Sequence, residues 1–374
     1  MKKKTKLKVA ANIESLVPYP PGKPLEELER ELGISGSIKL ASNENAWGPS
    51  PMAVAAIKAA LSNLHRYPDG SCYYLSQALA GKLGISPDQI VFGNGSNEII
   101  GLLINAFMQP GEEVITSHPT FLMYQKMVQA ANGSNRTVAL KDMRHDLEGI
   151  LAALSDKTRL IFLDVPNNPT GTIVDQEDFD NFLSRIPDDI IVVLDEAYVD
   201  FAPPAARLDT LAYINKNSGG PSVVALRTFS KAYGLAGLRI GYGLMSPEIA
   251  GYLHRVRQPF NVNYPAQVGA VAALADDEYY QQTIDRTRQG LAWLSKEIEK
   301  MGLKPFPSNT NFFLVDLGME AKGPYHAMLR KGVIVRPMQA YSFPNFIRIT
   351  VGKEEENQRL VTALAQTLAE LANG

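Results

Sequence analysis

The sequence predicts an α/β fold in which a mainly parallel sheet is flanked by helices and is followed by a smaller α+β domain. Short, apolar, β-branched runs alternate with longer helical patterns through the first two thirds of the chain, which is the strand–helix–strand order of parallel sheets. Several of these runs are apolar at every position, as is typical of strands covered on both faces. With 374 residues, 45% of them hydrophobic, the chain has enough material for roughly two domains.

The expected elements follow one another along the chain. The first strand–helix pairs are expected at residues 90–92 and 98–108, 113–116 and 121–131, and 160–165 and 176–186, with further buried strands at 190–194, 223–226 and 238–244. From residue 265 the pattern changes to a long helical stretch reaching Met301, then strands at 311–316, 333–336 and 346–351 and helices at 325–331 and 354–371. We therefore expect a large domain at residues 41–264, a small domain at 265–374, and an N-terminal arm, residues 1–40, that joins the small domain or a neighbouring subunit.

Composition excludes several classes of function. Lys and Arg number 37 against 39 Asp and Glu, so the net charge of −2 gives no basic field for nucleic acid or an anionic membrane. Cys72 is the only cysteine, and the five histidines have no metal-ligand spacing, so neither a disulfide nor a metal site is expected. Asn12 and Glu14 interrupt what would be the apolar core of a signal peptide. We expect a cytoplasmic protein that acts on small molecules.

Common nucleotide and hydrolase motifs are also missing. No Gly-Lys pair is followed by Ser or Thr, so there is no Walker loop, and no Gly-x-Ser-x-Gly elbow occurs. The nearest approach to a dinucleotide fingerprint, residues 93–95, lacks its third glycine. Hydride transfer and serine hydrolysis therefore have little support.

Polar residues gather after the expected strands, where open α/β sheets bind ligands. The first strand is followed by Gly93-Asn94-Gly95-Ser96-Asn97, a glycine turn that leads into a helix whose first amides suit a phosphate. The alternative for this segment is an ordinary capped helix. Asp195 ends another apolar run and is followed closely by Tyr198. A buried carboxylate needs a partner such as a protonated ring nitrogen, although a helix cap is the simpler alternative.

A third cluster, residues 227–239, holds Thr228, Ser230, Lys231 and Arg239. A desolvated lysine can act as a Schiff-base nucleophile or proton carrier, and the hydroxyls and arginine suit a phosphate. Taken alone, a surface lysine is the commoner case. Taken together, the clusters describe one ligand with an aldehyde, a pyridinium nitrogen, a phenolate oxygen and a phosphate, and pyridoxal phosphate has all four.

These residues resemble a known family. The chain is similar, nearly from end to end, to fold-type I pyridoxal-phosphate aminotransferases, and within them to the histidinol-phosphate aminotransferases. The segments that carry the resemblance are Pro20-Pro21-Gly22-Lys23-Pro24, Ser42-Asn43-Glu44-Asn45, Arg66-Tyr67-Pro68, Gly93 to Ser96, Pro166-Asn167-Asn168-Pro169-Thr170-Gly171, Asp195-Glu196-Ala197-Tyr198, Thr228 to Arg239, and Arg348 to Gly352. The resemblance implies a seven-stranded sheet of the fold-type I kind and a homodimer whose active site is shared between subunits.

The resemblance also implies roles for individual residues in binding the cofactor. Lys231 would be the Schiff-base lysine, Asp195 would pair with the ring nitrogen, and Asn168 and Tyr198 would hold the ring hydroxyl; Lys231, Asp195 and Tyr198 are the expected catalytic residues. Phe121 would stack on the ring face. The residues expected around the phosphate are Gly95, Ser96, Asn97, Thr228, Ser230, Arg239 and, from the neighbouring subunit, Tyr67.

For the substrate, the resemblance implies that Arg348 binds the carboxylate. It also suggests Asn43 and Tyr19 as substrate contacts and places Arg336 near a substrate phosphate. For Arg336, the alternative of an ordinary surface arginine at the end of a strand is equally supported. The implied reaction is transamination between L-histidinol phosphate and 2-oxoglutarate, giving imidazole acetol phosphate and glutamate in histidine biosynthesis. Aromatic amino-acid transamination and threonine-phosphate decarboxylation use the same first step and stay open. A ligand-sensing protein without catalysis is the alternative from another class.

Overall fold

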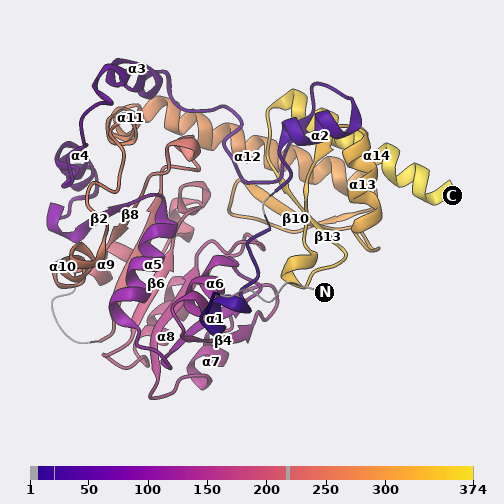
Figure 1. The fold of residues 1–374 in the computed structure, drawn as a ribbon. Coiled ribbons are helices and arrows are strands. Elements are labelled where there is room, and N and C mark those ends of the chain that lie inside the picture. Colours follow the sequence, from indigo (N-terminus) through magenta and orange to yellow (C-terminus); the bar gives the residue numbers. More distant parts are fainter. Residues whose placement is uncertain (1–6, 21, 216–219, 374) are drawn as a thin grey trace.

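The computed structural model describes residues 7–20, 22–215 and 220–373. The first six residues of the predicted arm, and Pro21 of the Pro20–Pro24 motif, lie outside this range. The described residues form a seven-stranded sheet, a four-stranded sheet and a separate two-stranded pair. Helices surround each of the two larger sheets, and the long helix α12 (Asp277–Lys300) runs from one of these groups to the other (Figure 1). Within the described ranges, no helix is long and apolar enough to cross a membrane.

The larger sheet has seven strands and confirms the predicted α/β class. Its strands, in spatial order, are β2 (Ile90–Gly93), β8 (Gly241–Leu244), β7 (Ser222–Thr228), β6 (Ile191–Asp195), β5 (Thr158–Asp164), β3 (Glu113–His118) and β4 (Ser134–Ala139). Neighbouring strands from β7 to β4 are parallel, whereas β8 is antiparallel to both β2 and β7. The run at 238–244 therefore forms a strand only from Gly241, and that strand runs opposite to the rest.

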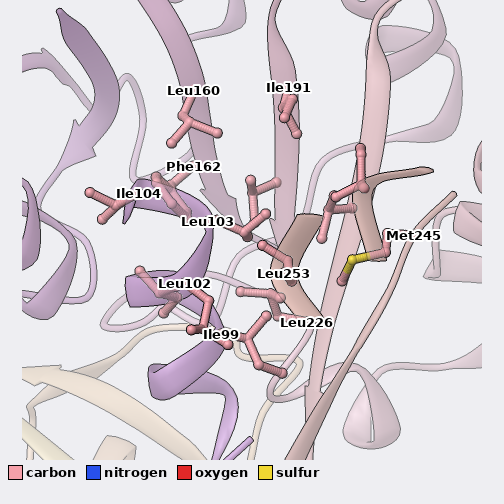
Figure 2. Packing of buried hydrophobic residues seen from close by; sticks show 14 of the residues in the cluster. Ile99, Leu102, Leu103, Ile104, Leu160, Phe162, Ile191, Leu226, Met245 and Leu253 are labelled. Atoms are coloured by element: carbon pink, nitrogen blue, oxygen red, sulfur yellow. The ribbon is translucent and has the colours of Figure 1, made fainter. Parts of the chain in front are cut away.

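Helices cover both faces of this sheet. One face packs against α5 (Ser96–Phe107), α6 (Met123–Ala130) and α10 (Pro247–Val256), and the other against α7 (Leu147–Ala152) and α8 (Gln176–Leu183). Helix α5 presents Ile99 and Leu103, four residues apart, to the strands, and both side chains are fully buried (Figure 2). Burying each such side chain is worth about 1.5–3 kcal/mol, so α5 is held firmly at the end of β2.

The smaller sheet is antiparallel, with the order β12 (Arg336–Pro337), β13 (Phe346–Thr350), β10 (Phe312–Asp316) and β9 (Lys304–Pro305). It packs with α12, α13 (Lys322–Arg330) and α14 (Glu354–Asn373). Part of the predicted arm lies here too, because β1 (Ile38–Lys39) pairs with β11 (Val333–Ile334) and α2 (Leu25–Leu32) packs beside it. The first helix, α1 (Ala11–Glu14), instead contacts α6, so the arm touches both groups.

The long helical stretch predicted from residue 265 is interrupted. Helix α11 (Tyr264–Ala275) ends before Asp276, whose side chain accepts a bond from the Tyr279 amide and caps α12. The buried face of α11 packs against α3 (Pro51–Ala60) and α4 (Tyr73–Leu83), beside the larger sheet. The domain boundaries, including the one at residue 264, stay predictions. The short helix α9 (Thr210–Ile214) completes the set of described α-helices.

Candidate active site

A cavity of about 390 Å³ opens at the carboxyl ends of the parallel strands, a size suited to a small ligand. Asp164 and Asp195 end β5 and β6, Thr228 ends β7, and α5 begins beside them. The residues that line the cavity are Ser42, Glu44, Gly95, Ser96, Asn97, Phe121, Tyr124, Asp164, Asn168, Asp195, Ala197, Tyr198, Thr228, Ser230, Lys231, Ala236, Gly237 and Arg239. The topology therefore brings together three clusters that are far apart in the sequence.

Lys231 enters the cavity from the loop after β7. Its Nζ donates to the carbonyl oxygens of Asn43 (3.0 Å) and Ser42 (3.4 Å) and lies 5.5 Å from the centre of the Tyr198 ring. Burial, together with the positive charge of Arg348, lowers the pKa of Lys231 to about 8. The neutral form, which a nucleophile or a proton acceptor requires, is therefore far more populated near physiological pH than in an ordinary lysine.

Asp195 forms another wall of the cavity. The residue is 5% exposed and accepts hydrogen bonds from the Tyr124 hydroxyl (2.8 Å) and the Ala197 amide (3.1 Å). Burial raises the pKa of this carboxyl to about 7, and the charge of Asp164 adds to the rise. No cationic side chain of the described chain is paired with Asp195. A cationic ligand group is what would balance its charge.

Tyr198 and Asn43 meet over the same cavity. The Asn43 side chain donates from Nδ2 to the Tyr198 hydroxyl (2.9 Å), and the Tyr198 ring packs edge-on against Phe312. Burial raises the pKa of Tyr198, so its hydroxyl keeps its proton and can donate to a ligand oxygen. Asn43 is buried and its main contacts are with protein groups, so the structure places it behind Tyr198 and Lys231.

Asn168 and Arg348 come from different sheets and are joined directly. Arg348 Nη1 donates to Asn168 Oδ1 (2.5 Å), and Nη2 donates to the carbonyl of Ala41 (3.0 Å). The guanidinium lies over the Phe312 ring, and its buried Nε has no partner among the described residues. An arginine with an unused donor, next to a cavity, is suited to a carboxylate ligand.

The corner of the cavity around Gly95 is suited to a phosphate. The first turn of α5 leaves the backbone amides of Ser96 and Asn97 without partners inside the helix. Gly95 has φ +76°, and a Cβ there would lie 2.8 Å from Arg239 Nη2. Thr228 and Ser230 bring hydroxyls 2.9 Å apart to the same corner. These donors leave room for an anion and almost none for a side chain.

Five predicted residues lie outside the cavity lining: Asn43 and Arg348, whose contacts are given above, and Tyr67, Tyr19 and Arg336. Tyr67 is 84% exposed and stacks on Phe260, Tyr19 is 40% exposed, and Arg336 donates to the carbonyl of Pro20. Phe121 does line the cavity, with its ring edge-on to Tyr124. The sequence analysis assigned no role to seven lining residues: Ser42, Glu44, Tyr124, Asp164, Ala197, Ala236 and Gly237. Asp164 ends an apolar strand just as Asp195 does, so the same signal would have found it.

Comparison with known proteins decides the family. The profile of the family described as aminotransferase class I and II matches residues 35–364. The chain belongs to this family. It is 56% identical to the histidinol-phosphate aminotransferase of Desulfotalea psychrophila over 98% of this chain and 97% of that protein. It is 45% identical to the enzyme of the same name from Moorella thermoacetica, over 96% and 92% of the two chains.

A solved structure extends the comparison to three dimensions. Histidinol-phosphate aminotransferase from Sinorhizobium meliloti, in complex with pyridoxal-5'-phosphate, superposes with a TM-score of 0.90 at 32% identity, covering 98% of this chain and 99% of that one. The predicted resemblance and the fold-type I architecture are thereby confirmed. As a class I and II aminotransferase, this protein is a pyridoxal-phosphate enzyme.

The residues of the cavity fit pyridoxal phosphate. A buried amine of lowered pKa, Lys231, suits an aldehyde, and a buried carboxyl without a cationic partner, Asp195, suits a pyridine nitrogen. The Gly95 corner brings backbone amides and Arg239 together, and a Cβ at Gly95 would crowd the guanidinium, so this corner suits the phosphate. Each functional group of the cofactor thus has a counterpart in the same cavity.

Proposed function

We propose that this protein transfers the amino group of L-histidinol phosphate to 2-oxoglutarate, giving imidazole acetol phosphate and glutamate in histidine biosynthesis. The observation that carries the proposal is that Lys231 and Asp195 line one buried cavity together with Tyr198 and Asn168. The choice of substrate is supported by the two histidinol-phosphate aminotransferases that share 45–56% of their residues with nearly the whole chain.

The proposed roles follow from the chemistry of each side chain. When bound, pyridoxal phosphate supplies an aldehyde carbon and a pyridinium ring that takes up the electrons of the substrate's Cα–H bond. Asp195 would hold a proton on the ring nitrogen, and the Tyr198 hydroxyl and Asn168 amide would contact the ring oxygen. Lys231 Nζ would accept the proton from the substrate α-carbon, for which a pKa of about 8 is well matched to neutral pH.

The remaining roles concern binding. The α5 amides, Thr228, Ser230 and Arg239 would hold the cofactor phosphate, and Phe121 would lie on the ring face. Arg348 would turn one edge of its guanidinium to the carboxylate of 2-oxoglutarate or glutamate. Tyr19 and Arg336 are adjacent to Pro20 on the arm and would contact the far end of the substrate, where a phosphate needs a cation.

We also propose a cytoplasmic homodimer. Tyr67 is 84% exposed beside a partly exposed Phe260, as expected of residues that a second subunit covers. In a dimer with a shared site, its hydroxyl would reach the partner's cofactor phosphate. A single, buried cysteine is suited to a reducing compartment.

The test follows the visible absorbance of the purified protein after addition of pyridoxal phosphate. L-Histidinol phosphate should convert the spectrum to that of pyridoxamine phosphate, and 2-oxoglutarate should reverse the change. Conversion by L-phenylalanine alone would favour aromatic transamination, and carbon dioxide release from threonine phosphate would favour decarboxylation. A protein that shows no cofactor absorbance after addition of pyridoxal phosphate would contradict the proposal.

A further inference from the structure

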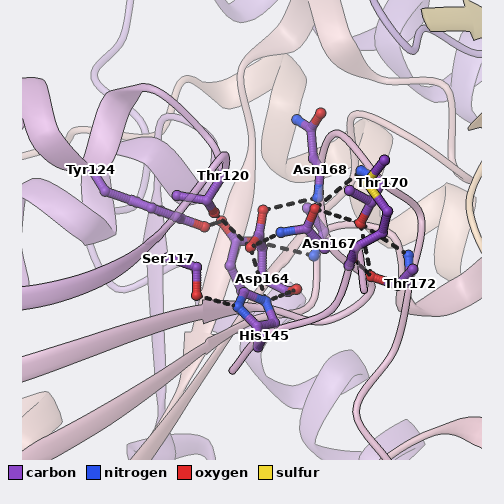
Figure 3. A network of polar contacts seen from close by, with 12 residues as sticks. Ser117, Thr120, Tyr124, His145, Asp164, Asn167, Asn168, Thr170 and Thr172 are labelled. Carbon is purple, nitrogen blue, oxygen red and sulfur yellow. Dashed lines mark hydrogen bonds and ion pairs between the residues drawn. The ribbon is translucent and has the colours of Figure 1, made fainter. Parts of the chain in front are cut away.

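A buried polar network adjoins the cavity and is centred on Asp164 (Figure 3). Asp164 ends β5 directly opposite Asp195 at the end of β6, and the two residues are 3% and 5% exposed. Two buried carboxylates on neighbouring strands repel one another when both are charged. Asp195 has a partner in the proposed function, whereas Asp164 has no role so far. Burying a second carboxylate next to Asp195 is unfavourable in free energy, so other interactions must stabilise Asp164 at this position.

Asp164 accepts two hydrogen bonds from the turn that carries Asn168 and one from Thr120, which follows β3. Its Oδ1 accepts from Thr120 Oγ1 (2.6 Å) and from Asn167 Nδ2 (2.9 Å), and its Oδ2 accepts from the Asn168 amide (2.9 Å). The turn after β5 is therefore tied to one carboxylate by a backbone bond and a side-chain bond. Asn168, which lines the cavity, takes its position from this attachment.

His145 supports Asp164 from the side away from Asn168. Its Nε2 lies 2.9 Å from the Asp164 carbonyl oxygen and 3.3 Å from Oδ1, while its Nδ1 lies 2.6 Å from Ser117 Oγ. Both atoms of Asp164 near the ring are oxygen acceptors, so Nε2 donates to Asp164. The ring is thus held between Ser117 and Asp164.

We propose that Asp164 is a positioning residue with two effects at the cofactor site. It fixes the turn that presents Asn168, and it places a second negative charge beside Asp195 that favours the protonated form of a bound pyridoxal phosphate. The inference rests on the proposed function, because it needs this cofactor in the cavity. His145 and Ser117 keep the carboxylate of Asp164 in its orientation.

Other charged and titratable groups face the same pair of carboxylates, and each contributes to the local field. They are Tyr124 on α6, Glu196 and Tyr198 after β6, Lys231 after β7, Arg348 on β13, and Tyr341 after β12. Asp164 differs from all of these, since it alone combines a charge next to Asp195 with a direct bond to the Asn168 backbone.

The test measures the bound cofactor rather than turnover. In Asp164→Asn, the pH midpoint of the cofactor's visible absorbance should fall by about one unit, because removing a nearby negative charge destabilises a protonated ligand. The dissociation constant for pyridoxal phosphate should rise by about tenfold or more, because the amide cannot accept all three bonds. The exposed Asp156→Asn exchange is the matched control, and neither value should change in it.

Thr120→Val separates the two effects and serves as the second variant if Asp164→Asn does not fold by circular dichroism. It removes one bond to Asp164 but keeps the charge, so we expect about a fivefold weaker cofactor affinity with an unchanged pH midpoint. Parental midpoint and affinity in Asp164→Asn, or parental affinity in Thr120→Val, would overturn the inference while leaving the proposed function intact. A parental protein without cofactor absorbance would instead overturn the proposed function.

Discussion

Arg348 donates a 2.5 Å hydrogen bond from Nη1 to Oδ1 of Asn168, and this bond joins the antiparallel sheet to the carboxyl edge of the parallel sheet. The residue proposed to bind the substrate carboxylate is thus in direct contact with one proposed to bind the cofactor. A planar guanidinium can hold Asn168 with one nitrogen while the rest of the fork faces a carboxylate. This geometry makes arginine difficult to replace here.

Arg348→Lys should raise KM for 2-oxoglutarate by about 10- to 100-fold, because an ammonium cannot serve Asn168, Ala41 and a carboxylate at once. Histidinol phosphate has no carboxylate, so its KM should change less. Steady-state kinetics with each substrate varied in turn would measure this. The exposed Arg330→Lys exchange on α13 is the control and should behave as the parent does. Parental KM values in Arg348→Lys would contradict the assigned role.

Lys231→Ala should lower kcat by at least about a thousandfold, because no other amine of the described residues lines the cavity to accept the α-proton. The variant should still bind pyridoxal phosphate through the phosphate corner, detectable as quenching of intrinsic fluorescence. Lys300→Ala, at an exposed position on α12, controls for the loss of a lysine. Full turnover by Lys231→Ala would exclude the proposed mechanism.

The raised pKa of Asp195 predicts how the free energy of unfolding of the cofactor-free protein depends on pH. In the folded chain the pKa of this carboxyl is about 7, against an ordinary value of 3.8, so between these pH values the folded state holds more protons than the unfolded state. Its contribution to stability is therefore lost as pH rises through that window, by an amount on the order of 4 kcal/mol. In thermal unfolding, Asp195→Asn should gain stability relative to the parent from about pH 4 to pH 7. A constant difference across that range would refute this account.

Gly95→Ala should weaken pyridoxal-phosphate binding by about tenfold or more. Gly95 has φ +76° and ψ 167°, a conformation that costs other residues about 1–3 kcal/mol, and the added methyl group would displace the Arg239 guanidinium. Gly101→Ala, in the same helix but with open space around the new Cβ, should instead leave affinity unchanged and add about 0.5–1 kcal/mol of stability. Equal cofactor affinities in the two variants would argue against a phosphate beside Gly95.

Tyr67→Phe tests whether the site is shared between subunits. Loss of a hydroxyl that donates to the partner's cofactor phosphate should raise the dissociation constant for pyridoxal phosphate by about tenfold, while sedimentation still shows a dimer. Tyr74→Phe, at another highly exposed tyrosine, should have no such effect. A monomer in sedimentation, or unchanged affinity in Tyr67→Phe, would contradict the proposed shared site.

The sequence was enough to predict the fold class and to single out Lys231 and Asp195, which the structure brings into one cavity, because both predictions depend on short-range patterns. Lys231 and Asp195 each follow or end an apolar strand, and polar side chains cluster around them in the sequence. The β4 strand was missed because Ser134–Ala139 has no buried residue and so lacks an apolar pattern. The residues of β8 also do not indicate that this strand is antiparallel to its neighbours.

Contacts between distant segments were beyond prediction for another reason. The bond between Arg348 and Asn168 spans 180 positions, and the register of Asp164 with Asp195 depends on how two strands align. Tyr124 reaches Asp195 only because α6 packs across the sheet. Such relationships depend on tertiary packing, which a single sequence does not specify at the level of individual atoms.

Asn43 contacts the smaller sheet, the segment that follows β6 and the lysine at once. Its amide donates to Thr350 Oγ1 on β13, its side chain donates to Tyr198, and its carbonyl accepts from Lys231 Nζ. Whatever shifts β13 relative to the larger sheet therefore changes how well the lysine ammonium is solvated. By thermodynamic reciprocity, releasing the proton from Lys231 must alter the preferred arrangement of the two sheets by the same free energy. The protonation of Lys231 and the relative position of the two sheets are then thermodynamically linked.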